Sequence, residues 1–159
     1  MAAKKRRSKR GSAANSISAR LLSEVTFFLD KGLGRYIVRN ALRDAGAIVE
    51  IHEDHFPADC PDTEWIKAVG KRGWVILSKD EHIRTNQLEV IELLQADTQV
   101  FILGGSQLTG SEMAQAFVAA LPDMLRFINK FVTPFVASIS RTGTVRMLLT
   151  HDELIKRIR

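Results

Sequence analysis

The sequence predicts an α/β fold of three layers, in which a mostly parallel sheet is flanked by helices. Short, almost wholly apolar runs alternate with longer segments whose apolar residues recur at helical spacing. Parallel strands need a crossover connection, and the helical segments between the runs supply it. The chain has 159 residues, of which 45% are hydrophobic, so it is long enough for one domain with a sizeable core.

Strands and helices are expected to alternate along the first two thirds of the chain. Gly46 and Gly73 lie where helix C-termini favour glycine, and Asp62 is a suitable N-cap. The expected elements are a strand at 25–29, a helix at 33–45, a strand at 47–52, a helix at 62–72, a strand at 74–77, a helix at 86–96 with Leu88, Ile91 and Leu94 or its neighbours directed inward, and a strand at 99–103.

The last third of the chain has a different pattern. Thr109 and Glu112 form a capping box that begins a helix, and Pro122 is expected to end it, with a new segment over 122–131. "PFVASISRTGTVRML" predicts two short strands around Arg141–Gly143, which form an edge hairpin. "THDELIKRIR" predicts a short helix. We therefore expect a tail at 1–22, a domain at 23–148 and a basic helical extension at 149–159.

Positive charge is concentrated near the N-terminus. Residues 1–20 contain seven basic side chains and no acidic one, which leaves 16 basic and 18 acidic residues elsewhere. The remainder carries a net charge of −2, so the expected domain is not a basic platform for nucleic acid, although the whole chain carries +5. The tail has too little apolar surface to order itself. It is either an arm that binds RNA or DNA or a solvated terminus.

Several protein classes do not fit the sequence. No apolar run reaches the roughly 18–20 residues of a membrane-spanning helix. The basic start leads into a polar segment rather than the apolar region of a signal peptide. Cys60 is the single cysteine, so no internal disulfide forms, and a reducing, cytoplasmic setting is expected.

Carboxylates follow two of the predicted apolar strands. Asp30 comes one residue after the first strand and Asp80 three residues after the third, while Asp62 opens a helix, with Glu64 close behind it. Ligand sites of parallel sheets form beyond the carboxyl ends of the strands, so these acids can converge at one edge. Asp62 and Asp80 also fit a purely structural role as caps, whereas Asp30 has no obvious capping role.

Clustered carboxylates raise one another's pKa unless a cation neutralises them. Mg²⁺ or Mn²⁺ is the expected occupant, because hard dications prefer oxygen ligands. Such an ion activates water and stabilises charge on a phosphate. Second-rank ligands, or residues that orient water, are Glu64, Asp54 and Glu81. Candidate contacts to substrate, with solvated surface charge as the alternative for the basic ones, are Lys31, Lys79, Arg84 and the rim residue Ser106.

Other motifs carry less weight. His52, His55 and Cys60 lie close in sequence but lack the second cysteine pair of a typical zinc site, and Cys60 is expected to be a passive thiol. "GGSQ" lacks the Lys-Ser/Thr of a P-loop. Aromatic residues make up only 7% of the chain and form no basic–aromatic stripe for single-stranded nucleic acid.

Three motifs, in this order, resemble the compact PIN-like domains, close to the toxins of bacterial toxin–antitoxin pairs. They are the strand that ends in Asp30, the helix opening "PDTEWI", and "GWVILSKD", which is similar to the Thr/Ser-Lys-Asp signature of that group. The downstream segments "VFILGGSQLTGSEMAQAFVAALP" and "PFVASISRTG" also resemble its second half. The resemblance covers roughly residues 24–148 and leaves out the tail.

The resemblance implies a PIN-type fold, a Mg²⁺ or Mn²⁺ site and endoribonuclease activity, with Asp30, Asp62 and Asp80 as metal-binding acids. It also implies an RNA substrate and a protein antitoxin, and leaves a homodimer open. Two features depart from the family. His82 stands where a further acid is common, and the first helix offers no glutamate, for which Asp54 or Glu64 would substitute.

Two alternatives stay open at this point. A catalytically silent PIN-like module that binds RNA or protein is favoured by His82. A receiver-like phosphoacceptor domain also gathers acids at strand ends, but it needs an acidic pair near the first strand, where "FFLDKG" supplies one.

Overall fold

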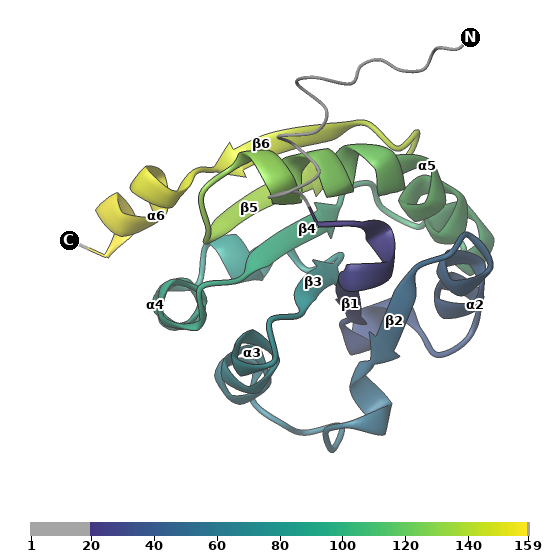
Figure 1. The fold of residues 1–159 in the computed structure, drawn as a ribbon. Helices are drawn as coiled ribbons and strands as arrows, with labels where there is room; N and C mark the ends of the chain where they lie inside the picture. Colours follow the sequence, from purple (N-terminus) through teal and green to yellow (C-terminus); the bar gives the residue numbers. More distant parts are fainter. Residues whose placement is uncertain (1–19, 159) are drawn as a thin grey trace, which may run out of the picture.

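A six-stranded sheet in the order β2-β1-β3-β4-β5-β6 forms the middle layer of the computed structural model, which describes residues 20–158 (Figure 1). The first five strands of this order pair in parallel, and β6 pairs with β5 antiparallel. The strands are β1 (Thr26–Leu29), β2 (Ile48–Ile51), β3 (Val75–Ser78), β4 (Gln99–Leu103), β5 (Phe135–Ile139) and β6 (Val145–Leu149). The predicted α/β fold with an edge hairpin is confirmed.

Helices cover both faces of the sheet, so the predicted three layers are present (Figure 1). One face carries α2 (Ile37–Asp44) and α5 (Gly110–Lys130), and the other carries α3 (Asp62–Lys71), α4 (Gln87–Ala96) and α6 (His151–Arg157). Within residues 20–158 there are also four short 3-10 turns: η1 (Leu22–Glu24), η2 (Lys31–Leu33), η3 (His52–Asp54) and η4 (Glu81–Arg84). No helix among residues 20–158 has the length and apolar character needed to cross a membrane.

Each strand divides its side chains between two cores, because successive residues point to opposite faces. In β1, Phe27 and Leu29 join the core under α2 and α5, whereas Phe28 joins the core under α3 and α4. The same alternation continues across the central strands, which are buried on both faces and read as unbroken apolar runs. The carboxyl ends of β1 to β5 therefore all reach one edge of the sheet.

The helix expected to stop at Pro122 is continuous, which corrects the sequence-based prediction. Helix α5 runs through Gly110–Lys130 with Pro122 inside it. Proline removes one backbone donor and costs roughly 3 kcal/mol in a helix interior. Pro122 is exposed, while Phe117, Ala120, Leu121 and Met124 on either side of it are buried. Packing of that apolar stripe against the sheet holds both halves in line.

Two smaller differences concern helix faces and starts. Helix α2 begins at Ile37 rather than residue 33, because Lys31–Leu33 form the separate turn η2. In α4, Leu88 is 68% exposed, and the buried face carries Val90, Leu93 and the acid Glu89. The inward face of α4 therefore differs from the expected one and brings a carboxyl group into the interior.

The two ends of the described chain are attached to the fold. Most of the predicted tail, residues 1–19, lies outside the described residues, but Arg20 exchanges backbone hydrogen bonds of 2.6 and 3.0 Å with the Asn129 side chain. At the other end, α6 begins in a capping box of Thr150 and Glu153 and buries Leu154 completely against the core under α3 and α4. Arg157 also donates to the backbone oxygen of Arg84 at 2.9 Å.

Candidate functional site

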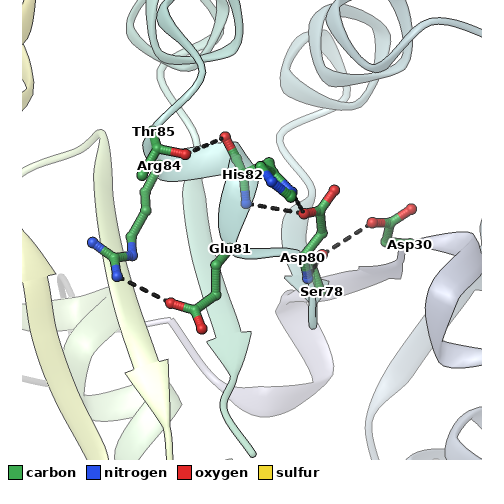
Figure 2. A network of polar contacts seen from close by, with 7 residues as sticks. All are labelled: Asp30, Ser78, Asp80, Glu81, His82, Arg84 and Thr85. Carbon is green, nitrogen blue, oxygen red and sulfur yellow. Dashed lines mark hydrogen bonds and ion pairs between the residues drawn. The ribbon is translucent and has the colours of Figure 1, made fainter. Parts of the chain in front are cut away.

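Asp30 and Asp80 are linked through Ser78 at the carboxyl ends of β1 and β3. The Ser78 hydroxyl donates to Asp30 Oδ2 at 2.9 Å and accepts from the backbone N–H of Asp80 at 3.0 Å (Figure 2). Asp30 is only 8% exposed, and Ser78 is fully buried. Strands β1 and β3 are parallel neighbours, so Asp30 and Ser78 lie side by side at their ends. The buried apolar residues before Ser78 therefore position its hydroxyl to bond Asp30.

Asp62 reaches the same region from the first turn of α3. The indole N–H of Trp65, one turn later, donates to Asp62 Oδ1 at 2.8 Å, and Trp65 is fully buried. The expected N-cap role of Asp62 is not observed, because Pro61 occupies that position and Asp62 is the first helical residue. The carboxyl group is thus held by a side chain of its own helix rather than used on the backbone.

Helix α4 approaches α3 closely enough to add a fourth acid. A Cβ atom on Gly70 would lie 2.3 Å from that of Ala96, so only glycine permits this contact between the two helices. Glu89, on the buried face of α4, is 8% exposed, and its Oε1 atom has no hydrogen-bond partner among the described residues. We call Asp30, Asp62, Asp80 and Glu89 the acid cluster.

The cluster perturbs the protonation of its members. Burial raises the pKa of Glu89 to about 7, helped by the charges of Asp62 and Asp80 and by a hydrogen bond with Asp62 that needs a proton on one carboxyl group. Burial also raises the pKa of Asp30, with the Asp62 charge acting in the same direction and the Ser78 hydroxyl against it. Carboxylate charges nearby thus help to raise the pKa values of Glu89 and Asp30, as expected for clustered acids that no cation neutralises.

Glu89 is not among the acids predicted from the sequence, although its position in the sequence carries one signal. Glu89 precedes Val90 and lies one helical turn before Leu93, so it occupies an apolar position of α4. An acid on the buried face of an amphipathic helix calls for a partner or a function. The mistaken inward face of this helix concealed that signal.

Asp80 has a second partner that bears on its availability. Its Oδ1 atom accepts from the backbone N–H of His82 and contacts His82 Nδ1, both at 2.9 Å. Figure 2 shows this contact between His82 and Asp80; the His82 side chain is 84% exposed, so the contact is open to solvent. Asp80 therefore also caps the turn η4, the structural role that the sequence allowed.

Comparison with known proteins identifies the family. A family model described as "PIN like domain" matches residues 25–105, about half of the chain. The chain belongs to the PIN-like domain family. The matched segment contains all four residues of the acid cluster together with Ser78.

One curated relative covers more of the chain. The protein named "Putative ribonuclease VapC45", from Mycobacterium tuberculosis (strain ATCC 25618 / H37Rv), is 27% identical over 125 residues, which is 76% of this chain and 90% of that protein. No solved structure matched the chain. The PIN-like resemblance drawn from the sequence is thus confirmed at the level of the family.

The remaining predicted acids lie apart from the cluster of this PIN-like domain. Asp54 is exposed in the turn η3 after β2, and Glu64 is exposed on α3. Among residues 20–158, no hydrogen bond or ion pair links either of them to the acid cluster. The pKa of the Cys60 thiol is raised, first by burial and then by the negative charge of Glu64.

The predicted substrate contacts differ in their exposure and in their partners. Lys31 donates to the backbone oxygen of Ala58 at 2.6 Å and so braces the loop before α3. Lys79 is exposed beside Gly105, and Ser106 is exposed at the end of β4. Arg84 pairs with Glu81 at 3.0 Å, on the side of the network opposite Asp30 (Figure 2). Lys31 and Lys79 each adjoin an acid of the cluster and are exposed, but within residues 20–158 only Lys31 has a hydrogen-bond partner, so the ammonium group of Lys79 is the more available.

The two histidines and the cysteine do not assemble a soft metal site. His55 contacts Glu50 at 2.7 Å and Arg72 at 3.1 Å, and the Cys60 thiol faces the Pro61 carbonyl. His52 is buried against aromatic rings, and burial lowers the pKa of its imidazole.

A hard dication fits the donor chemistry of the acid cluster. In the described part of the chain, no group of three or more His, Cys, Asp or Glu side chains is arranged so that it could hold a metal ion. Mg²⁺ does not need such a group, since it retains several waters and commonly uses one or two carboxylates plus substrate phosphates. The unpartnered Oε1 of Glu89 and the raised pKa values mark the buried charge that such an ion would balance.

Proposed function

We propose that this chain is a metal-dependent endoribonuclease that cleaves RNA phosphodiester bonds as the toxin of a toxin–antitoxin pair. The observation that carries the proposal is the acid cluster at the carboxyl edge of a PIN-like sheet, in which Asp30 and Glu89 are buried and the pKa of Glu89 is raised to about 7. The printed name of the Mycobacterium tuberculosis relative, a putative ribonuclease, supports the same activity.

Asp30, Asp62, Asp80 and Glu89 would hold Mg²⁺ or Mn²⁺, with Asp54 and Glu64 as weaker candidates outside the cluster. A bound dication supplies activation of water and neutralisation of charge on the phosphate. The rest of the work falls to the chain. Ser78 and Trp65 fix the orientations of Asp30 and Asp62 by hydrogen bonds, and the buried floor keeps the carboxylates in a low-dielectric setting.

Contacts to RNA are assigned to the exposed basic rim. Lys79 is the first choice for a phosphate beside the cluster, and Lys31, Arg84 and Ser106 are further candidates. The protein antitoxin and a homodimer stay predictions that follow from the family resemblance.

A second candidate function is a silent PIN-like module that binds RNA or protein without cleaving it. The contact between His82 and Asp80 favours it, because the imidazole occupies the solvent side of one proposed ligand. The two functions differ in whether metal produces new RNA ends.

Cleavage of a mixed RNA pool by the purified chain, with Mn²⁺, Mg²⁺ or EDTA, tests the proposal. Asp30→Asn should lower the rate by on the order of a hundredfold, since the site loses a charge while Ser78 keeps an acceptor. Asp44→Asn, an exposed acid at the end of α2, is the matched control and should cut as the wild type does. Cleavage that survives in EDTA, or equally in Asp30→Asn, would exclude the metal-dependent mechanism.

A further inference from the structure

A lateral row of residues connects the acid cluster to the far edge of the sheet. Phe28 pairs with Ile76, which places Asp30 beside Ser78; Ser78 pairs with Ile102, Ile102 with Ser138, and Ser138 with Arg146. All five row positions, Asp30, Ser78, Ile102, Ser138 and Arg146, lie on the face that carries α3 and α4. Four steps between neighbouring strands give the row a length of ~19 Å.

The far end of this row opens into a groove of about 550 Å³. Its wall combines the carboxyl ends of β4 and β5 with the β5–β6 hairpin: Gly104, Gly105, Ser138, Ile139, Ser140, Arg141, Thr144 and Arg146. Both charged residues in this lining are arginines. The sign of charge at this end of the sheet edge is therefore opposite to that at the acid cluster.

Several donors in the groove are free to take a ligand. Arg146 is exposed, and within residues 20–158 its guanidinium makes no hydrogen bond or ion pair; the same holds for the hydroxyls of Ser138 and Thr144. Arg141 has one distant partner, Glu112, at 3.8 Å. Ser140 differs, because its hydroxyl accepts from the backbone of the hairpin turn and so shapes the loop.

The hairpin that carries these arginines is fixed in place. Gly143 has φ of +92°, and a Cβ there would lie 2.6 Å from the Ala119 side chain on α5. The turn is thus pressed against α5, and Gly143 is buried within it. A fixed hairpin presents the guanidinium groups with less loss of entropy than a mobile loop would.

We propose that this groove binds the sugar–phosphate backbone of single-stranded RNA several nucleotides away from the bond that is cut. The inference rests on the proposed ribonuclease function and extends its substrate site. Arg146 supplies a fork of donors that matches phosphate oxygens, Ser138 and Thr144 add hydroxyl donors, and Arg141 contributes charge. A smaller pocket lined by Lys79, Leu103 and Gly105 continues the path toward the acid cluster.

The chemistry of the groove favours a nucleic-acid backbone over bases or an apolar partner. The lining holds no aromatic side chain for stacking on a base. Contacts to phosphate position a strand without reading its sequence. The groove therefore orients the RNA and increases the length of strand in contact with the protein, while any preference for sequence arises elsewhere.

The test measures binding of fluorescent single-stranded RNA to the full chain in EDTA, where cleavage is off, by anisotropy over a series of salt concentrations. Arg146→Ala should weaken binding roughly five- to tenfold and reduce the slope of log affinity against log salt by about one. Arg146→Lys should fall between wild type and Arg146→Ala. Arg126→Ala removes an exposed charge on α5 and is the control, with at most a twofold effect.

Oligonucleotide length gives a second, independent readout. RNA too short to span the row should bind wild type and Arg146→Ala alike, whereas longer RNA should separate them. Basic residues of the N-terminal tail are present in every variant, so they shift all affinities together.

Equal affinities for wild type and Arg146→Ala on long RNA would overturn the groove while leaving the nuclease proposal intact if both proteins cut. The same holds for equal losses in Arg146→Ala and Arg126→Ala, which would reflect net charge alone. A length-dependent loss in Arg146→Ala, in a protein that cuts no RNA with any metal, would support the groove and reject the nuclease.

Discussion

The two ends of the sheet's carboxyl edge handle charge in opposite ways. At the end formed by β1 and β3, two carboxyl groups are buried and two are half-buried, and Ser78 and Trp65 hold Asp30 and Asp62 in place. At the end formed by β5 and β6, guanidinium groups are exposed and almost unpaired. The carboxyl groups therefore interact strongly with one another over short distances, whereas the arginines offer a weaker attraction for anions along a groove.

This difference predicts where substitutions will matter most. Interactions in a buried, low-dielectric site are strong and geometrically strict, whereas exposed charges are screened by water and salt. Changes in the acid cluster should therefore alter chemistry and stability by large factors. Changes at the basic end should alter affinity by small factors that depend on salt.

The largest expected effect distinguishes two aspartates, Asp62 and Asp54, which differ in exposure and in hydrogen-bond partners. Asp62→Asn should lower RNA cleavage on the order of a hundredfold, because the Trp65 hydrogen bond can remain while the charge is lost. Asp54→Asn should change the rate less than twofold, since Asp54 is exposed and outside the cluster. Initial rates on one defined RNA with saturating Mn²⁺ measure both.

The reverse result, in which Asp54→Asn inactivates the chain and Asp62→Asn does not, would move the site to the end of β2. Thermal unfolding of both variants checks that neither substitution lowers the cleavage rate merely by unfolding the protein.

Glu89→Gln should separate stability from activity. The folded pKa of Glu89 is raised to about 7 from its ordinary 4.5, so the folded state retains a proton that the unfolded chain has released between these values. Stability of the metal-free wild type therefore falls as pH rises from 4.5 to 7, by on the order of 1–3 kcal/mol once solvent screening is allowed for, and then levels off. A glutamine has no proton to lose and avoids that penalty.

The variant should thus equal or trail the wild type near pH 4.5 and exceed it above pH 7. Urea unfolding in EDTA at several pH values measures the difference, and the same variant should cut RNA poorly. A difference that does not change with pH would refute the buried, coupled state of Glu89.

Local sequence patterns were sufficient for the sheet but not for the whole cluster. Asp30 was found because an apolar strand ending in a carboxylate has no other local explanation, and strand ends in a parallel sheet meet at one edge. Glu89 was missed because its role depends on how closely α4 packs on α3, which Gly70 and Ala96 decide. That contact joins positions far apart in the chain.

The same limit applies to helix α5 and to the basic end. Pro122 has a strong local tendency to stop a helix, and only the burial of neighbours such as Phe117 and Met124 overrides it. Arg146 appears in the sequence as one more charge in a short strand. Its relation to Asp30 exists only through the register of five strands.

Ser78→Ala tests whether the hydroxyl group that links Asp30 to Asp80 contributes to RNA cleavage as well as to folding stability. The substitution removes the donor to Asp30 and leaves the Asp80 backbone N–H without its acceptor. We expect a loss of about 1–3 kcal/mol in the free energy of unfolding and roughly tenfold slower cleavage. Thr98→Val removes a buried hydroxyl that donates to the Trp74 backbone oxygen, outside the acid cluster and the groove; it is the matched control for stability and should leave the cleavage rate unchanged. Unchanged cleavage in Ser78→Ala would assign Ser78 to folding alone.

His82→Ala is the smallest effect and decides between the catalytic and the silent module. Its imidazole contacts the same Asp80 oxygen that a dication would use, but the side chain is 84% exposed, so the contact is weak. Removal should lower the Mn²⁺ concentration for half-maximal cleavage about twofold, while the backbone N–H of residue 82 still holds Asp80 in place. A catalytic chain tolerates histidine at this position because Asp30 and Glu89 are buried and Asp62 is held by Trp65, none of which depends on a contact with His82. If His82→Ala instead created activity in a chain that otherwise cuts nothing, histidine would be the element that silences the site.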